Sequence, residues 1–126
     1  MKRTGLLLAI LIAGLGLGAC DSGPQGPGNL IAAVQGTSLG GVVLEVRGRG
    51  ILGFEGLGGT QVYAAPLAGT EDAHRVLLIH PEGEELRFEI QVEDLGMDDP
   101  LMRVVSAAGA DNSTRLTAGI ETRIER

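Results

Sequence analysis

The clearest pattern along this chain is the alternation of apolar and polar residues over positions 86–92. Leu86, Phe88, Ile90 and Val92 are apolar, and a polar residue stands between each pair. Successive side chains of a β-strand point to opposite faces, so a period of two predicts a strand with one buried face and one face in water.

Several other segments also have the character of strands. Residues 42–47 and 120–125 repeat the alternation, which predicts a sheet with one wet face. Residues 76–79 are all apolar with β-branched ends, and they predict a central strand covered on both faces. Weaker candidate strands are residues 30–35, 51–54, 61–65 and 103–107.

Glycine and proline interrupt these segments at intervals too short for long helices. The expected breaks are Gly40-Gly41, residues 48–50 and 58–59, Pro66, Pro81, Gly96, Pro100 and Gly109. We interpret the glycine-rich segments 48–50 and 57–59 as hairpin turns, and residues 98–102 as the place for a helical turn. About seven or eight short strands in roughly 100 residues predict a single antiparallel β-sandwich of immunoglobulin size.

The N-terminus has a different pattern. Lys2 and Arg3 precede an uncharged stretch over residues 6–19 that closes on small residues, which is the three-part pattern of a secretory signal. Its apolar core, residues 6–17, is shorter than the about 20 residues that a transmembrane helix needs. A removable signal is therefore favoured over a permanent span.

The end of this stretch, Leu17-Gly18-Ala19-Cys20, resembles the lipobox of bacterial prolipoproteins. The resemblance implies that Cys20 receives a diacylglyceryl group on its sulfur and that a signal peptidase cuts between Ala19 and Cys20. It also implies an extracytoplasmic protein held at a membrane by its N-terminal lipid, since two acyl chains anchor a protein stably. Asp21 resembles a retention signal of some bacterial groups, so the inner and the outer membrane both stay open.

These observations divide the chain into three parts. Residues 1–19 are the expected signal peptide, and residues 29–126 the expected β-sandwich domain. Between them, residues 20–28 join the lipidated cysteine to a Gly- and Pro-rich stretch with little to bury, which predicts a tether. Because Cys20 is the only cysteine, the domain has no disulfide and depends on burial of its core.

Charge narrows the classes of partner. The chain has a formal net charge of −6, with 10 basic and 16 acidic residues, and loss of Lys2 and Arg3 with the signal would leave 8 basic residues and a net charge of −8. Nucleic-acid binding and a polybasic membrane contact both need clustered Lys and Arg, so neither is expected.

The acidic residues suggest one metal. Loop carboxylates can hold Ca²⁺, which takes six to eight oxygen ligands. The densest acidic stretch supplies the candidates Glu93, Asp94, Asp98 and Asp99, although their spacing does not match an EF-hand loop. The alternative interpretation is that these residues serve turns and solubility.

Other candidate chemistry is weaker. His74 and His80 share parity on the 76–79 strand but are separated by about 20 Å of extended chain, so they cannot bind one metal from that strand. We interpret them as histidines at a solvated rim. Ser38, Ser106 and Ser113 lie in no Gly-x-Ser-x-Gly motif, and no enzyme activity is predicted.

The spacing of strands and turns after residue 29 is similar to that of bacterial cohesin and carbohydrate-binding domains. The segments that carry this resemblance are residues 42–47, 50–54, 75–79, 86–92 and 104–112. The resemblance implies docking or sugar contact, and because Tyr63 alone cannot form a stacking platform, protein docking is favoured. We therefore expect a lipid-anchored structural or protein-interaction module with a cell-envelope partner. The alternative is a calcium-assisted module that binds a sugar or peptide.

Overall fold

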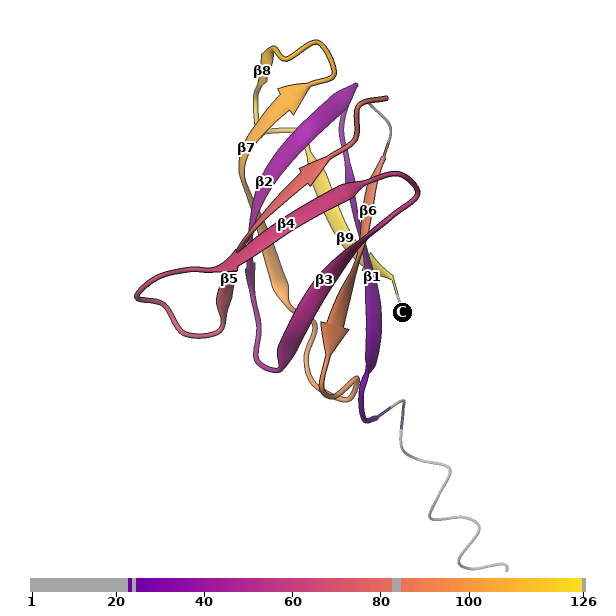
Figure 1. Ribbon diagram of the computed structural model, residues 1–126, viewed down its shortest axis with the longest axis vertical. Coiled ribbons are helices and arrows are strands. Elements are labelled where there is room, and N and C mark those ends of the chain that lie inside the picture. Colours follow the sequence, from indigo (N-terminus) through magenta and orange to yellow (C-terminus); the bar gives the residue numbers. More distant parts are fainter. Residues whose placement is uncertain (1–22, 24, 83–84, 126) are drawn as a thin grey trace, which may run out of the picture.

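The computed structural model describes residue 23, residues 25–82 and residues 85–125 (Figure 1). These residues form nine β-strands and no helix. The strands are β1 (Gly28–Gln35), β2 (Leu39–Arg47), β3 (Ile51–Leu57), β4 (Gln61–Pro66), β5 (Ala73–Ile79), β6 (Leu86–Val92), β7 (Leu101–Gly109), β8 (Thr114–Arg115) and β9 (Glu121–Glu125).

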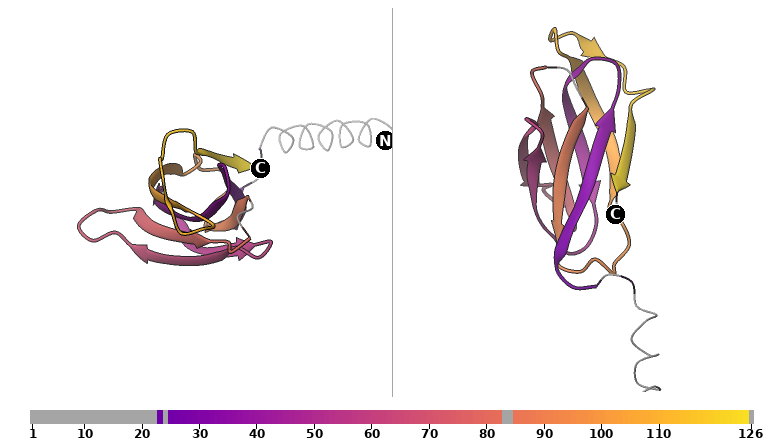
Figure 2. Two further views of the ribbon diagram at one scale, coloured as in Figure 1. Left: turned by 90° about the horizontal axis from the view of Figure 1, so that it is seen from above. Right: turned by 90° about the vertical axis from the view of Figure 1, so that its right-hand side faces the viewer.

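The strands form two antiparallel sheets that pack face to face (Figure 2). The four-stranded sheet has the order β3-β6-β1-β9, and the five-stranded sheet has the order β4-β5-β2-β7-β8. The fold is therefore an all-β sandwich, which confirms the fold class predicted from the alternating segments. The strand expected at residues 86–92 is β6, with the same bounds.

The core lies between the two sheets and is mostly aliphatic. Phe88 is fully buried, and its ring centroid lies 6.3 Å from that of Phe54. The other large buried side chains are Leu39, Leu44, Leu78, Leu86, Ile90, Val34, Val42, Val46 and Val76. Full burial of such a side chain contributes about 1.5–3 kcal/mol, so the predicted apolar faces supply the stability of the sandwich.

The outer face of the four-stranded sheet is polar and carries several ion pairs. Arg87 on β6 pairs with Glu125 on β9 at 3.2 Å, and Arg123 on β9 pairs with Glu85 at 2.8 Å. This is the wet face that the alternation of residues 86–92 and 120–125 predicts.

The strand predicted at residues 76–79 is β5, and it lies inside the five-stranded sheet between β4 and β2, as expected. Val76 and Leu78 point inward and are fully buried. Leu77 and Ile79 on the opposite side are only half-buried. The expectation that both faces of this strand are covered is therefore wrong for the outer face.

Three predictions about turns are wrong. Residues 48–50 join β2 to β3, and residues 58–60 join β3 to β4, so each turn links strands of different sheets and neither closes a hairpin. Residues 98–102 form no helical turn, because Leu101 and Met102 already belong to β7. Pro100 explains this difference, since a proline disfavours the helical conformation of the residue before it.

Gly40 and Gly41 do not end a strand but lie inside β2. Leu39 pairs with Gly109 and Gly41 pairs with Ala108, so Gly40 is an extra residue in the ladder, a β-bulge. A Cβ atom at Gly40 would lie 2.8 Å from both the Cα of Ala110 and the carbonyl oxygen of Gly109. The bulge therefore needs glycine because another backbone passes too close for a side chain.

The last residues of the expected tether contact the domain. The N–H of Gly26 donates to the Oδ1 of Asp94 at 3.0 Å, and the N–H of Leu95 donates to the carbonyl oxygen of Gly26 at 2.8 Å. β1 then begins at Gly28. Ala19 and Cys20, on which the expectation of a lipid anchor depends, lie outside the described residues.

The two glycines of the bulge give a matched test of this close approach. We expect Gly40→Ala to lower the free energy of unfolding by about 1–3 kcal/mol, because the new Cβ meets backbone that cannot move aside. Gly41→Ala should keep or slightly raise stability, because the nearest atom to its Cβ is the Leu78 oxygen at 3.6 Å. Urea denaturation of both variants measures this, and equal stabilities would contradict the proposed crowding.

Candidate functional site

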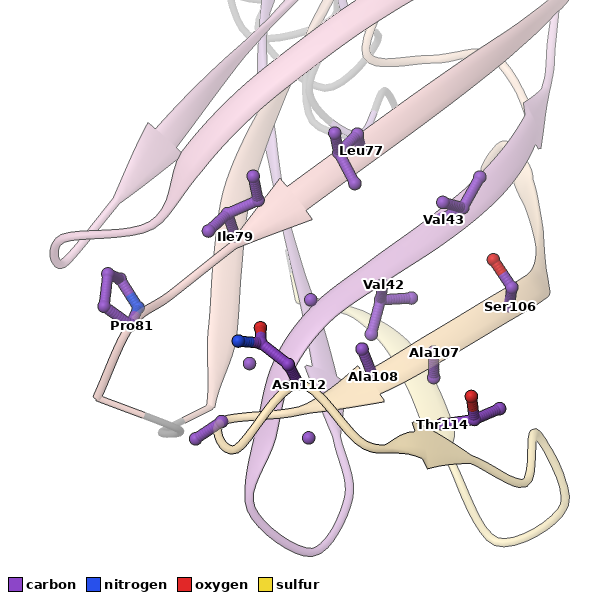
Figure 3. A pocket seen from close by; sticks show the side chains of 14 residues that line it. Val42, Val43, Leu77, Ile79, Pro81, Ser106, Ala107, Ala108, Asn112 and Thr114 are labelled. Atoms are coloured by element: carbon purple, nitrogen blue, oxygen red, sulfur yellow. The ribbon is translucent and has the colours of Figure 1, made fainter.

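A groove of about 630 Å³ lies on the outer face of the five-stranded sheet (Figure 3). Apolar side chains of β2 and β5 form one side of it, namely Val43, Leu77 and Ile79. The turn between β7 and β8 and the start of β8 form the opposite side, where Asn112 and Thr114 add polar atoms (Figure 3). The groove is thus an apolar surface with a partly polar rim.

Small residues make the floor of this groove. Ile79 on β5 pairs with Gly41 on β2, Gly41 pairs with Ala108 on β7, and Ala108 pairs with Thr114 on β8. Paired residues of neighbouring strands point to the same face of a sheet. Gly41 and Ala108 have little or no side chain, so they form the floor of the groove. The larger side chain of Ile79 rises beside them as a wall.

The next row of the sheet carries the apolar surface toward the edge. Tyr63 on β4 pairs with Leu77 on β5, Leu77 pairs with Val43 on β2, and Val43 pairs with Ser106 on β7. Tyr63 is 58% exposed, although it is one of the few aromatic residues of the chain. The apolar surface therefore extends from the groove to edge strand β4.

The sequence pattern did not predict this surface. The available signal was the absence of alternation in residues 76–79, which we interpreted as cover on both faces. An unbroken apolar run has the same pattern whether its second face is covered by the same chain or left for another molecule.

The next outward-facing row along the sheet, which contains Glu45 and Arg103, is charged. Glu45 on β2 is only 5% exposed, and both its oxygens accept hydrogen bonds from arginines. Arg103 on β7 donates from Nη2 at 2.7 Å and from Nε at 3.1 Å to Oε2, and Arg47 donates to Oε1 at 2.9 Å. These two arginines cover the carboxylate, and they hold the pKa of Glu45 below its usual range, with Arg103 as the larger cause.

His80 is buried, so its interpretation as a residue of a solvated rim is wrong. It is 5% exposed, and its Nδ1 accepts the N–H of Glu82 at 3.2 Å. Its Nε2 therefore carries the proton and donates to the carbonyl oxygen of Gly58 at 3.1 Å. His80 thus connects the turn after β3 with the segment after β5, and both of its nitrogens have structural partners.

His74 lies at the other end of β5 and faces Phe54. The two ring centroids are 5.3 Å apart with an edge-on orientation. The Nδ1 of His74 is buried and has no hydrogen-bond partner among the residues that the structure describes. As expected from their separation along the strand, the two histidines have separate environments.

The structure does not bring the four calcium candidates into one set of ligands. Asp94 accepts the N–H groups of Gly96 at 2.9 Å and Gly26 at 3.0 Å, and these bonds lower its pKa. Asp98 and Asp99 border a second surface pocket, separate from the groove, and Arg47 and Arg49 also line that pocket. Glu93 lies beside Gly50.

Within residues 23, 25–82 and 85–125, no three His, Cys, Asp or Glu side chains converge as a metal-binding group. The same residues contain no helix that is long and apolar enough to span a membrane. The described part of the chain thus defines an all-β sandwich domain with an apolar groove on one outer face. In comparisons with known proteins, no protein-family model, curated protein or solved structure matches this chain.

The lowered pKa of Glu45 predicts that its contribution to the stability of the fold depends on pH. Its ordinary value is 4.5 and the folded value is lower, so the folded state binds fewer protons than the unfolded state in acid. The contribution of Glu45 to stability should be full at pH 7 and should be lost as the pH falls through the lowered pKa.

Thermal unfolding of the unchanged protein and of Glu45→Gln from pH 7 to pH 3 measures this contribution. We expect the variant to have the lower Tm at pH 7 and the difference to shrink in acid, where the protonated carboxyl resembles the amide. The carboxylates of Asp94 and Asp111, whose pKa values are also lowered, are present in both proteins and cancel in the difference. A difference in Tm that does not depend on pH would contradict this explanation.

Proposed function

We propose that the chain is a lipid-anchored module of the bacterial cell envelope and that its β-sandwich binds a protein partner through the groove. The observation that carries this proposal is the contrast between the two outer faces. Several ion pairs lie on the outer face of the four-stranded sheet. On the five-stranded sheet, the half-buried side chains of Val43, Leu77 and Ile79 form an apolar surface beside the ion pairs of Glu45.

The chemistry of the groove suits a protein surface. Its apolar side chains form a continuous surface that another molecule can cover. Protein interfaces combine an apolar centre with a polar rim, and here Ser106, Asn112 and Thr114 supply hydroxyl and amide groups beside the apolar side chains. The resemblance to cohesin and carbohydrate-binding domains implies docking or sugar contact, and docking is favoured because Tyr63 alone cannot form a stacking platform for sugars.

The proposed anchor is compatible with access to the groove. The tether would enter the domain through β1, which belongs to the four-stranded sheet, while the groove lies on the outer face of the other layer. Seven residues lie between Cys20 and Gly28, where β1 begins, and each can extend at most about 3.3–3.6 Å. β1 begins at the end of the sandwich opposite the β7–β8 turn that borders the groove, so the proposed tether would leave the groove open (Figure 1).

The anchor is tested at Cys20. We expect Cys20→Ala to abolish incorporation of a labelled fatty acid and to leave an uncleaved or soluble precursor, because the thiol is the group that receives the lipid. Ser22→Ala, two residues further on, should be labelled and processed like the unchanged protein. Continued labelling of Cys20→Ala would disprove the anchor.

The groove is tested by site-specific photocrosslinking of the full chain in cells. A photoreactive residue at Leu77 should give a discrete adduct with one protein, whereas the same residue at Arg87, on the polar outer face, should not. Gly41→Leu should suppress the adduct from position 77, because its side chain would fill the floor of the groove. Equal adducts from both faces, or an adduct that Gly41→Leu leaves unchanged, would contradict docking at the groove.

A further inference from the structure

The edges of the two sheets differ in how well they are protected from other strands. In the described chain the edge strands are β3 and β9 of one sheet and β4 and β8 of the other. An edge strand has unpaired N–H and C=O groups, and proteins block such edges with charges, bulges or short strands.

Three of these edges carry such protection. β9 has charged side chains at Glu121, Arg123 and Glu125. β3 contains Glu55, and its register with β6 shifts between Ile51 and Gly53. The third, β8, has only two residues and covers only the end of β7.

The part of β7 that β8 leaves uncovered is itself irregular. Its register with β2 shifts, because Val43 pairs with Ser106 whereas Leu44 pairs with Val104. The extra residue between them makes a bulge, and Arg103 adds a charge to the same stretch. This edge is therefore also poorly suited to accept another strand.

Edge strand β4 has no charge and no bulge, and its one proline, Pro66, stands only at its last position. Its sequence, Gln61–Pro66, contains no charged residue, and its register with β5 is regular throughout. All of its residues are exposed except the half-buried Val62. β4 is thus an uncharged and regular edge on the described part of the sandwich.

The backbone of β4 has a defined set of outward groups. The N–H of Leu67 donates to the carbonyl oxygen of Ala73 at 2.9 Å. Hydrogen bonding alternates along an antiparallel pair, so Tyr63 and Ala65 also direct their backbone groups toward β5. Val62 and Ala64 therefore direct theirs away from the sheet, and Pro66 has no N–H to offer.

We propose that β4 pairs with β4 of a second copy of this chain, antiparallel and around a twofold axis at Tyr63. In this register Val62 lies opposite Ala64 of the second copy, and every outward N–H and C=O group of these two residues finds a partner. Tyr63 lies opposite Tyr63 of the second copy on the outer face. A register centred on Ala64 would instead place Val62 opposite Pro66, and the carbonyl of Val62 would have no donor.

Two features of the surface favour a second copy as the occupant. A strand without charges brings no like charges together when it pairs with itself. The apolar row Val43, Leu77 and Tyr63 also ends at this edge, so twofold pairing joins the rows of the two copies into one continuous apolar strip. Such an interface uses the same patch on both copies and closes as a dimer.

The dimer is independent of the proposed partner and is compatible with the proposed anchor. A twofold axis perpendicular to the paired sheets turns both four-stranded sheets to the same side. Because the axis also reverses the direction of β1, the two proposed tethers would start at opposite ends of the dimer, both on the side of the four-stranded sheets.

Cysteine crosslinking of the purified full-length protein in detergent tests the register. Opposed residues of a non-hydrogen-bonded pair have Cα atoms about 4.5 Å apart, within the range of a disulfide. We expect Tyr63→Cys to form a covalent dimer under mild oxidation on a non-reducing gel. Gln61→Cys alone and Ala65→Cys alone should not, because each would lie about 14 Å from its own counterpart.

A mixture of Gln61→Cys and Ala65→Cys should crosslink, since these positions are opposite each other in the proposed register. The unchanged protein, which has only Cys20, measures any dimer that forms through that thiol. Crosslinking of Tyr63→Cys no greater than that of the unchanged protein, or equal crosslinking of all three single variants, would overturn the proposal.

Proline substitutions test the pairing without an added thiol. Ala64→Pro removes an N–H that has no partner within the sheet, so we expect a monomer in analytical ultracentrifugation with a nearly unchanged Tm. Ala65→Pro removes an N–H that points to β5 and should lower the Tm instead. The proposal is wrong if the unchanged protein is a monomer, or if Ala64→Pro sediments as a dimer.

Discussion

Apolar contact between the inner faces of the two sheets holds this domain together. Phe88 and Ile90 from the four-stranded sheet and Leu44 and Leu78 from the five-stranded sheet are fully buried in it. The domain contains no cysteine, so no disulfide supports the sandwich and its stability depends on this burial. Every strand must keep its apolar side chains toward this layer, and the outer faces are thereby free to differ in chemistry.

The five-stranded sheet uses this freedom to place unlike surfaces side by side. Val43 contributes to the apolar groove, and Glu45, two residues further along β2, is covered by Arg103 and Arg47. A carboxylate so close to apolar side chains remains charged because guanidinium groups bond both of its oxygens. Binding at the groove and pairing at β4 would both extend the apolar half of this sheet.

The strands could be predicted from the sequence because their signal is local. The alternation in residues 86–92 already implies which face of β6 is buried, and the structure gives the same bounds. The turns were predicted less well. In the sequence, a glycine pair in a turn cannot be told from a glycine pair in a bulge. Only the close approach of Ala110 to Gly40 in the structure distinguishes the two.

The candidate site depended on information that no local pattern contains. Its floor needs Gly41 beside Ala108 and its wall needs Ile79, and these residues come from three strands whose order and register follow from packing of the whole chain. The burial of His80 similarly depends on Gly58, which belongs to a distant turn. Sequence alone therefore indicates the strands, their inward faces and an expected anchor at Cys20. Only the tertiary structure decides which outward side chains become neighbours, because that depends on pairing between strands far apart along the chain.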